Sequence, residues 1–181
     1  MFSYPYFQAL IIAALCSVSS LSLAALQMET IAEGLDTPWS VAELPDGGLL
    51  VTERPGSIKH VAPSGEITAI TGVPEVFAKG QGGLFDVVLH PNFTANNTVF
   101  LAYAAGSKDS NRTTVARGVL EGGALTDVAV IFEVSPTKRG GGHFGGRMAF
   151  LADGTMLLSV GEGYTLREDA QKTGSQLGKL L

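Results

Sequence analysis

The 181-residue sequence is poor in cysteine, in basic residues and in helical hydrophobic segments, and each shortage excludes a class of protein. The only cysteine is Cys16, so the remainder of the chain can form no disulfide framework and no thiolate metal site. Twelve lysines and arginines against 17 acidic residues give a net charge of −5, which argues against nucleic-acid binding because neutralising phosphates requires a basic surface. Beyond the first 24 residues, no apolar stretch of at least ten residues has helical spacing, which disfavours helical bundles and coiled coils.

Residues 1–24 have the pattern of a signal peptide. Ala9–Leu15 is an apolar run, and Ser22-Leu23-Ala24 forms a small-x-small cleavage site before Ala25. Two alternatives remain open: a membrane anchor, although serines dilute the roughly 20 apolar residues that a span requires, and lipidation of Cys16. The sequence therefore predicts export to the periplasm or the cell exterior, with no stable membrane span once the signal is removed.

Glycine is abundant instead, with 23 residues that have no collagen-like period and that bound short apolar runs. Runs of four to seven apolar residues between turn residues are typical of β-strands. The predicted strands are Trp39–Leu44, Leu49–Thr52, Ser57–Val61, Leu84–Leu89, Val99–Tyr103, Thr114–Leu120, Val128–Val134, Met148–Leu151 and Met156–Val160. The predicted fold class is all-β, with at most a short helical turn between residues 169 and 181.

These strands contain a repeat. Leu44–Thr52 and Leu151–Ser159 align without gaps around an Asp-Gly pair, and Leu84–Phe93 is a divergent third copy. The aligned leucines of the three copies are 45 and 62 residues apart, which is close to the length of a β-propeller blade. The Asp-Gly pairs are expected in the hairpin between the first two strands of a blade. A β-sandwich with similar hairpins is the alternative.

The strands predicted here suffice for only two to three blades, whereas propellers close with four to eight. Gly178–Leu181 begins what has the pattern of another apolar strand. We therefore expect residues 25–181 to be the N-terminal part of a truncated propeller domain.

Three motifs follow one another in the chain: Gly80–Phe93 (GQGGLFDVVLHPNF), Gly142–Gly154 (GHFGGRMAFLADG) and Gly174–Leu181 (GSQLGKLL), preceded by Leu35–Trp39 (LDTPW). Their order and spacing resemble those of the pyrroloquinoline-quinone (PQQ)-dependent glucose/sorbosone dehydrogenases, in the soluble aldose sugar dehydrogenase branch. The resemblance implies a six-bladed propeller in the complete protein. It also implies an exported enzyme that uses PQQ and calcium to oxidise a small sugar, an aldose, at C1 to the lactone, with an electron acceptor that the sequence does not identify.

The resemblance assigns roles to three side chains. His143 matches the histidine that takes the proton of the C1 hydroxyl beside the quinone, and an imidazole titrates near the pH at which a general base works. Glu162 stands where the family usually has an aspartate that hydrogen-bonds this histidine; its extra methylene loosens that geometry, and an ordinary turn carboxylate is the alternative. Gln81 matches a glutamine that contacts the quinone through its amide. No metal ligand is assigned, because the calcium ligands and most cofactor contacts are expected beyond Leu181.

Other polar residues are given structural roles. His60 and His90 have no second ligand at metal-binding spacing and are interpreted as packing histidines, and Arg147 is interpreted as structural. The 181 residues alone are expected to be inactive. The alternative function is a non-catalytic propeller that binds a carbohydrate or a protein, because the hedgehog-interacting protein is built on a similar propeller.

Overall fold

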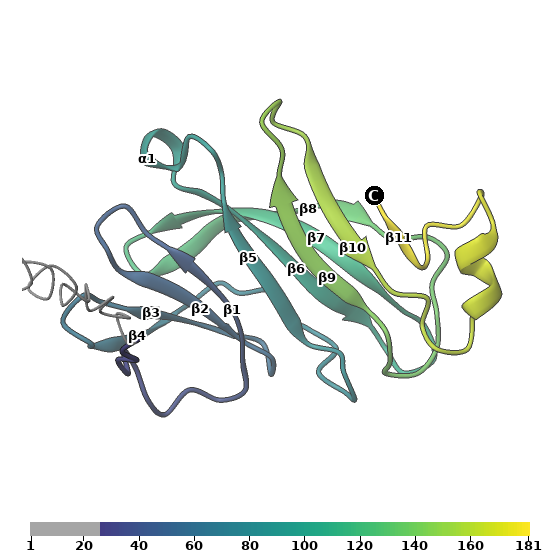
Figure 1. Cartoon of the computed structure of the whole chain (residues 1–181), viewed down its shortest axis with the longest axis horizontal. Helices are drawn as coiled ribbons and strands as arrows, with labels where there is room; N and C mark the ends of the chain where they lie inside the picture. Colours follow the sequence, from purple (N-terminus) through teal and green to yellow (C-terminus); the bar gives the residue numbers. More distant parts are fainter. Residues whose placement is uncertain (1–25) are drawn as a thin grey trace, which may run out of the picture. The chain divides into compact units, whose positions relative to one another are not determined.

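The computed structural model describes residues 26–181, which form three antiparallel β-sheets that follow one another along the chain (Figure 1). Residues 1–25, which include the predicted signal peptide, lie outside the described residues. The described strands are β1 (Pro38–Glu43), β2 (Leu49–Glu53), β3 (Ser57–Val61), β4 (Ile67–Ile70), β5 (Leu84–Leu89), β6 (Thr98–Gly106), β7 (Asn111–Glu121), β8 (Ala124–Glu133), β9 (Gly145–Phe150), β10 (Met156–Val160) and β11 (Lys179–Leu180).

Each sheet is a meander in which neighbouring strands are consecutive in sequence: β1–β4, β5–β8 and β9–β11. The helical elements described are one turn of helix, α1 (Phe93–Asn96), and a 3₁₀ segment, η1 (Arg167–Gln171). In the described part of the chain, no helix has the length and hydrophobicity needed to cross a membrane. The predicted all-β class is confirmed.

The two Asp-Gly hairpins have the same hydrogen bonds. Between β1 and β2, the Leu44 amide donates to the Gly48 carbonyl at 2.7 Å, and between β9 and β10, the Leu151 amide donates to the Thr155 carbonyl at 2.8 Å. In both hairpins the aspartate side chain accepts a hydrogen bond of 2.9 Å from the amide two residues later, which is the local contact that favours aspartate in turns. The sequence repeat is therefore also a structural repeat.

The middle sheet contributes to two hydrophobic cores, one on each of its faces. Along β6, Val99, Leu101 and Tyr103 pack in a core with residues of the first sheet. Phe100 and Ala102, which alternate with them, pack in a second core with residues of the third sheet. Because successive side chains of a strand point to opposite faces, one strand supplies both cores, and the sheets stack face to face as propeller blades do.

Some elements differ from the sequence prediction. β4 was not predicted, because only Ile70 of its four residues is buried and its sequence shows no alternation. β8 begins at Ala124, four residues before the predicted strand. The last residues contain η1 followed by β11, and β11 coincides with the apolar segment predicted to begin another strand.

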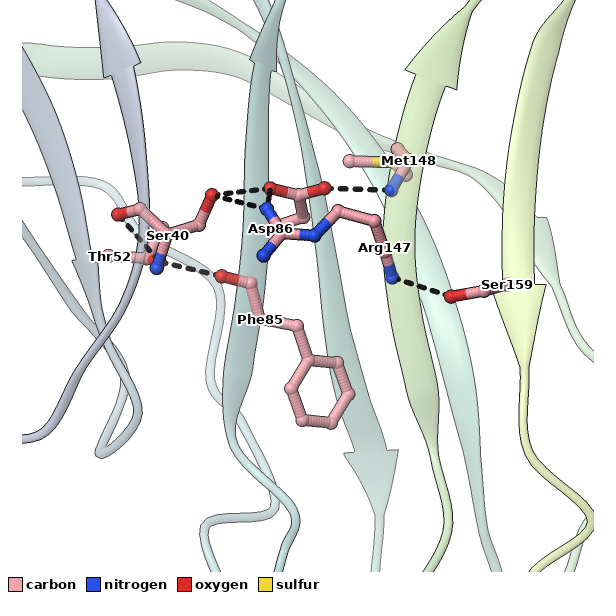
Figure 2. A network of polar contacts seen from close by, with 7 residues as sticks. All are labelled: Ser40, Thr52, Phe85, Asp86, Arg147, Met148 and Ser159. Carbon is pink, nitrogen blue, oxygen red and sulfur yellow. Dashed lines mark hydrogen bonds and ion pairs between the residues drawn. The ribbon is translucent and has the colours of Figure 1, made fainter.

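A buried carboxylate joins the first strands of the three sheets (Figure 2). Asp86 on β5 is 1% exposed, and it accepts hydrogen bonds from the Ser40 hydroxyl on β1, from Arg147 Nη1 on β9 at 3.0 Å and from the Met148 amide on β9 at 2.7 Å. We call these four residues the Asp86 cluster. Arg147 thus takes a structural place, and β1, β5 and β9 are held side by side (Figure 1).

Candidate functional site

The three candidate residues predicted from the sequence lie together, near the starts of β5 and β9 and the end of β10. Gln81 precedes β5 by three residues, His143 precedes β9 by two, and Glu162 follows β10 by two. β9 and β10 are antiparallel, with Val160 opposite Gly145, so the start of one strand lies beside the end of the other. β5 in turn contacts β9, which brings the Gln81 loop to the same place.

His143 and Glu162 form a direct pair. Nδ1 of His143 lies 2.6 Å from Oε1 of Glu162, so the longer glutamate does reach the imidazole. The hydrogen bond with His143 is the main cause that lowers the pKa of Glu162 below its usual value, and the Tyr164 amide also donates to Oε1, at 3.2 Å. An ionised carboxylate can only accept, so the proton of the pair is on Nδ1 and the lone pair of a neutral imidazole is on Nε2.

Gln81 holds the backbone of His143 through its side chain. Its side-chain Oε1 accepts a hydrogen bond from the backbone N–H of His143 at 2.8 Å. The backbone N–H of Gln81 donates to the Gly141 carbonyl at 2.7 Å. Among the hydrogen bonds of the described residues, none uses the side-chain NH₂ group of Gln81, which is exposed. This hold of Gln81 on the His143 backbone was not predicted from the sequence.

Close backbone packing explains part of the glycine content of these loops. A Cβ on Gly80, which has φ of +62°, would lie 2.6 Å from the Gly141 oxygen, and a Cβ on Gly161 would lie 2.2 Å from the His143 oxygen. Gly140, in contrast, has open space where its Cβ would be. The glycines thus let three loops contact one another through their backbones, a contribution that was not predicted from the sequence.

Three residues around the His143 loop have places that were not predicted. The Tyr164 ring lies edge-on to the imidazole, with 5.3 Å between the ring centroids, and the Arg167 guanidinium stacks over Tyr164 at 4.6 Å. Lys138 is buried behind the loop and donates to the Gly142 carbonyl at 2.9 Å. The position of Tyr164 two residues after Glu162 could have placed it at the site. Nothing in the sequence indicated that Lys138 is buried.

The other histidines lie elsewhere. The His90 ring stacks on Phe100, with 6.2 Å between centroids, and its Nδ1 accepts the Asn92 amide at 2.9 Å. His60 is on β3 in the first sheet, where its ring lies against Gly48. Neither residue belongs to the site. Among residues 26–181, no group of three or more His, Cys, Asp or Glu side chains is arranged to bind a metal ion.

Comparisons with known proteins identify the family of this chain. The family model described as Glucose / Sorbosone dehydrogenase matches residues 35–181. The aldose sugar dehydrogenase YliI of Escherichia coli (strain K12) is 37% identical over 163 residues, which cover 87% of this chain and 44% of that protein. The hedgehog-interacting protein of Mus musculus is 26% identical over 167 residues, which cover 81% of this chain and 24% of that protein.

Solved structures show the same likeness. The soluble aldose sugar dehydrogenase from Escherichia coli in the apo-form matches with a TM-score of 0.79 and 36% identity, over 84% of this chain and 45% of that one. The PQQ-bound aldose sugar dehydrogenase from Streptomyces coelicolor matches with a TM-score of 0.75 and 32% identity, over 85% and 46%. The chain thus spans less than half the length of these proteins, and its three sheets are part of a β-propeller, as predicted.

Proposed function

This chain belongs to the glucose/sorbosone dehydrogenase family, and we propose that the protein oxidises the C1 hydroxyl of an aldose to a lactone with PQQ, with His143 as the general base. The observation that carries the proposal is the His143–Glu162 pair at 2.6 Å. A carboxylate on Nδ1 fixes the imidazole with its basic nitrogen, Nε2, directed away from the pair, which is what removal of a hydroxyl proton requires.

The residues of the pair have separate tasks in this reaction. Nε2 of His143 accepts the proton of the C1 hydroxyl, and Glu162 stabilises the imidazolium that results. PQQ, when bound, would supply the oxidising chemistry, as an acceptor for the hydride that leaves C1. Loss of one proton and one hydride converts the C1 hydroxyl into the lactone carbonyl.

The polar groups of the site suit an oxygen-rich, flat cofactor. The side-chain NH₂ group of Gln81 can donate to a quinone or carboxylate oxygen, whereas Nε2 of His143 accepts from the substrate hydroxyl beside it. Next to them, Gly140 leaves open space and Gly142 has only the Tyr164 Cβ and the Gln81 Oε1 near the position of a Cβ. Gln81 would therefore hold one oxygen-bearing edge of the cofactor, and the His143 ring would lie against the cofactor beside that edge.

Three further elements of the proposal rest on the family or on residues 1–24. Calcium is expected as a second cofactor, with ligands from other parts of the protein. Export to the periplasm or the cell exterior rests on the predicted signal peptide alone. A small sugar is the proposed substrate.

The proposal is tested by adding PQQ and calcium to the purified full-length protein. We expect saturable quinone binding, followed by absorbance, and oxidation of aldoses with an artificial dye as electron acceptor. If the folded protein binds no quinone, the dehydrogenase proposal fails, and a non-catalytic propeller that binds a carbohydrate or a protein takes its place.

Replacing Glu162 with glutamine tests the pairing of the site. Glutamine removes the negative charge that favours imidazolium, so kcat is expected to fall, by less than for loss of His143 itself, and the acid limb of the pH–rate profile should move to lower pH. Glu162→Asp, which restores the usual family residue, should equal or exceed the wild type. Steady-state rates between pH 5 and 9 measure both. An unchanged profile in Glu162→Gln would mean that the carboxylate does not act on the base.

A further inference from the structure

Lys138 is buried directly behind the loop that carries His143. It is 3% exposed, although a lysine is rarely buried unless its charge is paired or solvated by polar groups. Its Nζ donates to the Gly142 carbonyl at 2.9 Å and to Asn111 Oδ1 at 3.0 Å, and it lies 3.2 Å from the centre of the Phe144 ring. These contacts provide one partner for each of the three hydrogens of an ammonium group.

Asn111 extends this support to the beginning of the loop. Its Nδ2 donates to the Gly140 carbonyl at 2.7 Å, so Asn111 and Lys138 together hold the carbonyls of Gly140 and Gly142. The next residue, His143, has φ of +49°, a left-handed conformation that costs a residue other than glycine about 1–3 kcal/mol. Such a conformation persists only where the surroundings hold it.

We propose that Lys138 is a positioning residue for His143: its ammonium group holds the Gly142 carbonyl and thereby fixes the backbone that presents the imidazole to Glu162. This inference rests on the proposed role of His143 as the base. Lys138 holds the loop through the Gly142 carbonyl, whereas Gln81 holds it through the His143 amide.

The charge of Lys138 also bears on the pair. Burial lowers the pKa of Lys138 from 10.5 to about 8, against the attraction of Glu162, which acts on it from the loop after β10. The imidazole of His143, bound to Glu162, is the other titratable group there. The remaining groups described in contact with the Lys138 side chain are uncharged: Asn111, Gly142, Phe144 and Gly163. We therefore expect Lys138 to be charged at neutral pH and to lose its proton near pH 8.

These features give the proposal a directional consequence. A positive charge behind the pair disfavours imidazolium, so removing it should move the titration of the His143 ring to higher pH. Removing Glu162 should move the same titration to lower pH. If Lys138 only stabilised the fold, its replacement would leave the titration of the His143 ring unchanged.

The variant that tests this is Lys138→Met in the full-length protein without cofactor. Methionine is unbranched and apolar, so it can occupy the space of the lysine stem beside Phe144, and it removes a charge whose burial is costly. The matched control is Lys179→Met. Lys179 is partly buried and donates to the carbonyls of Asp169, Ala170 and Leu177, but not to the His143 loop.

The readout is the ¹⁵N spectrum of the histidine rings against pH, with His143 assigned through His143→Gln. In the wild type, we expect the His143 signals to show a second inflection near pH 8. In Lys138→Met, this inflection should disappear, the ring titration should move to higher pH and the Nδ1–H signal should weaken. Lys179→Met should match the wild type. With cofactor bound, kcat of Lys138→Met should fall by about 10–100-fold, with little change in quinone affinity, because small displacements of a base are costly.

Wild-type His143 signals in Lys138→Met would overturn the proposal. If that variant does not fold, the wild type decides, because the absence of an inflection near pH 8 in its His143 signals also overturns it. A failure of the proposed function would be seen in other measurements. His143→Gln would keep its activity, or the protein would bind no quinone, and neither result depends on the spectra of Lys138→Met.

Discussion

Replacing His143 with glutamine is expected to lower kcat for sugar oxidation by about 10²–10⁴-fold, the usual contribution of a general base. Glutamine is similar in size and can still donate to Glu162, but it has no basic nitrogen. Its backbone must also adopt the left-handed conformation that histidine adopts at this position. Quinone affinity should therefore be largely kept while turnover is lost, and steady-state kinetics with a dye acceptor measures the difference.

The matched control is His60→Gln, because His60 lies on β3 in the first sheet, away from the site loops. This control should turn over sugar at the wild-type rate. If His143→Gln itself keeps the wild-type kcat at saturating sugar and quinone, His143 is not the base. The pair with Glu162 would then be a structural contact only.

Replacing Asp86 with alanine is expected to lower the free energy of unfolding by about 2–4 kcal/mol, because it leaves buried donors without an acceptor. The Ser40 hydroxyl and the Met148 amide lose their shared partner in the interior. Arg147 contributes least, since its side chain is 61% exposed and can turn to water. The substitution should destabilise all three sheets, because the Asp86 cluster joins β1, β5 and β9 (Figure 2).

Urea unfolding of the full-length protein measures this loss. Trp39, the only tryptophan of these 181 residues, stacks with Arg147 at 4.6 Å and therefore reports on the cluster by fluorescence. Asp109→Ala, at an exposed turn position, serves as the control and should change the unfolding free energy by less than about 0.5 kcal/mol. A loss below about 1 kcal/mol for Asp86→Ala would show that the cluster does not hold the sheets together.

The features that the sequence predicted well are local or repeated. The Asp-Gly hairpins could be found because turn chemistry depends on a few neighbouring residues, and their recurrence indicated blades. The meeting of Gln81, His143 and Glu162 is different. Their residue types and motif positions were visible in the sequence, but the 2.6 Å contact between His143 and Glu162 depends on the antiparallel pairing of β9 with β10.

The roles of two residues, Asp86 and Lys138, were not predicted because they depend on burial in the folded chain. Asp86 lies in an apolar strand and Lys138 in a polar loop, yet both are almost completely buried, because partners 46 to 62 residues from Asp86 and 27 residues from Lys138 converge on them. Tertiary partners of this kind leave no periodic signal. β4 escaped prediction for the opposite reason, since three of its four residues are exposed and pairing with β3 defines it.

The environment of Asn111 has a consequence for the choice of expression host. Asn92, Asn96 and Asn111 each begin an Asn-x-Thr acceptor sequence for N-linked glycans. Asn92 and Asn96 are exposed beside α1, and the Nδ2 atom of Asn96 lies 3.0 Å from Nδ1 of His90. Asn111 is 1% exposed, and Nδ2, the atom that would carry the sugar, donates to the carbonyls of Ser107 and Gly140. A cell that glycosylates the chain before it folds would therefore block the support of the His143 loop, whereas a host without this modification leaves it intact.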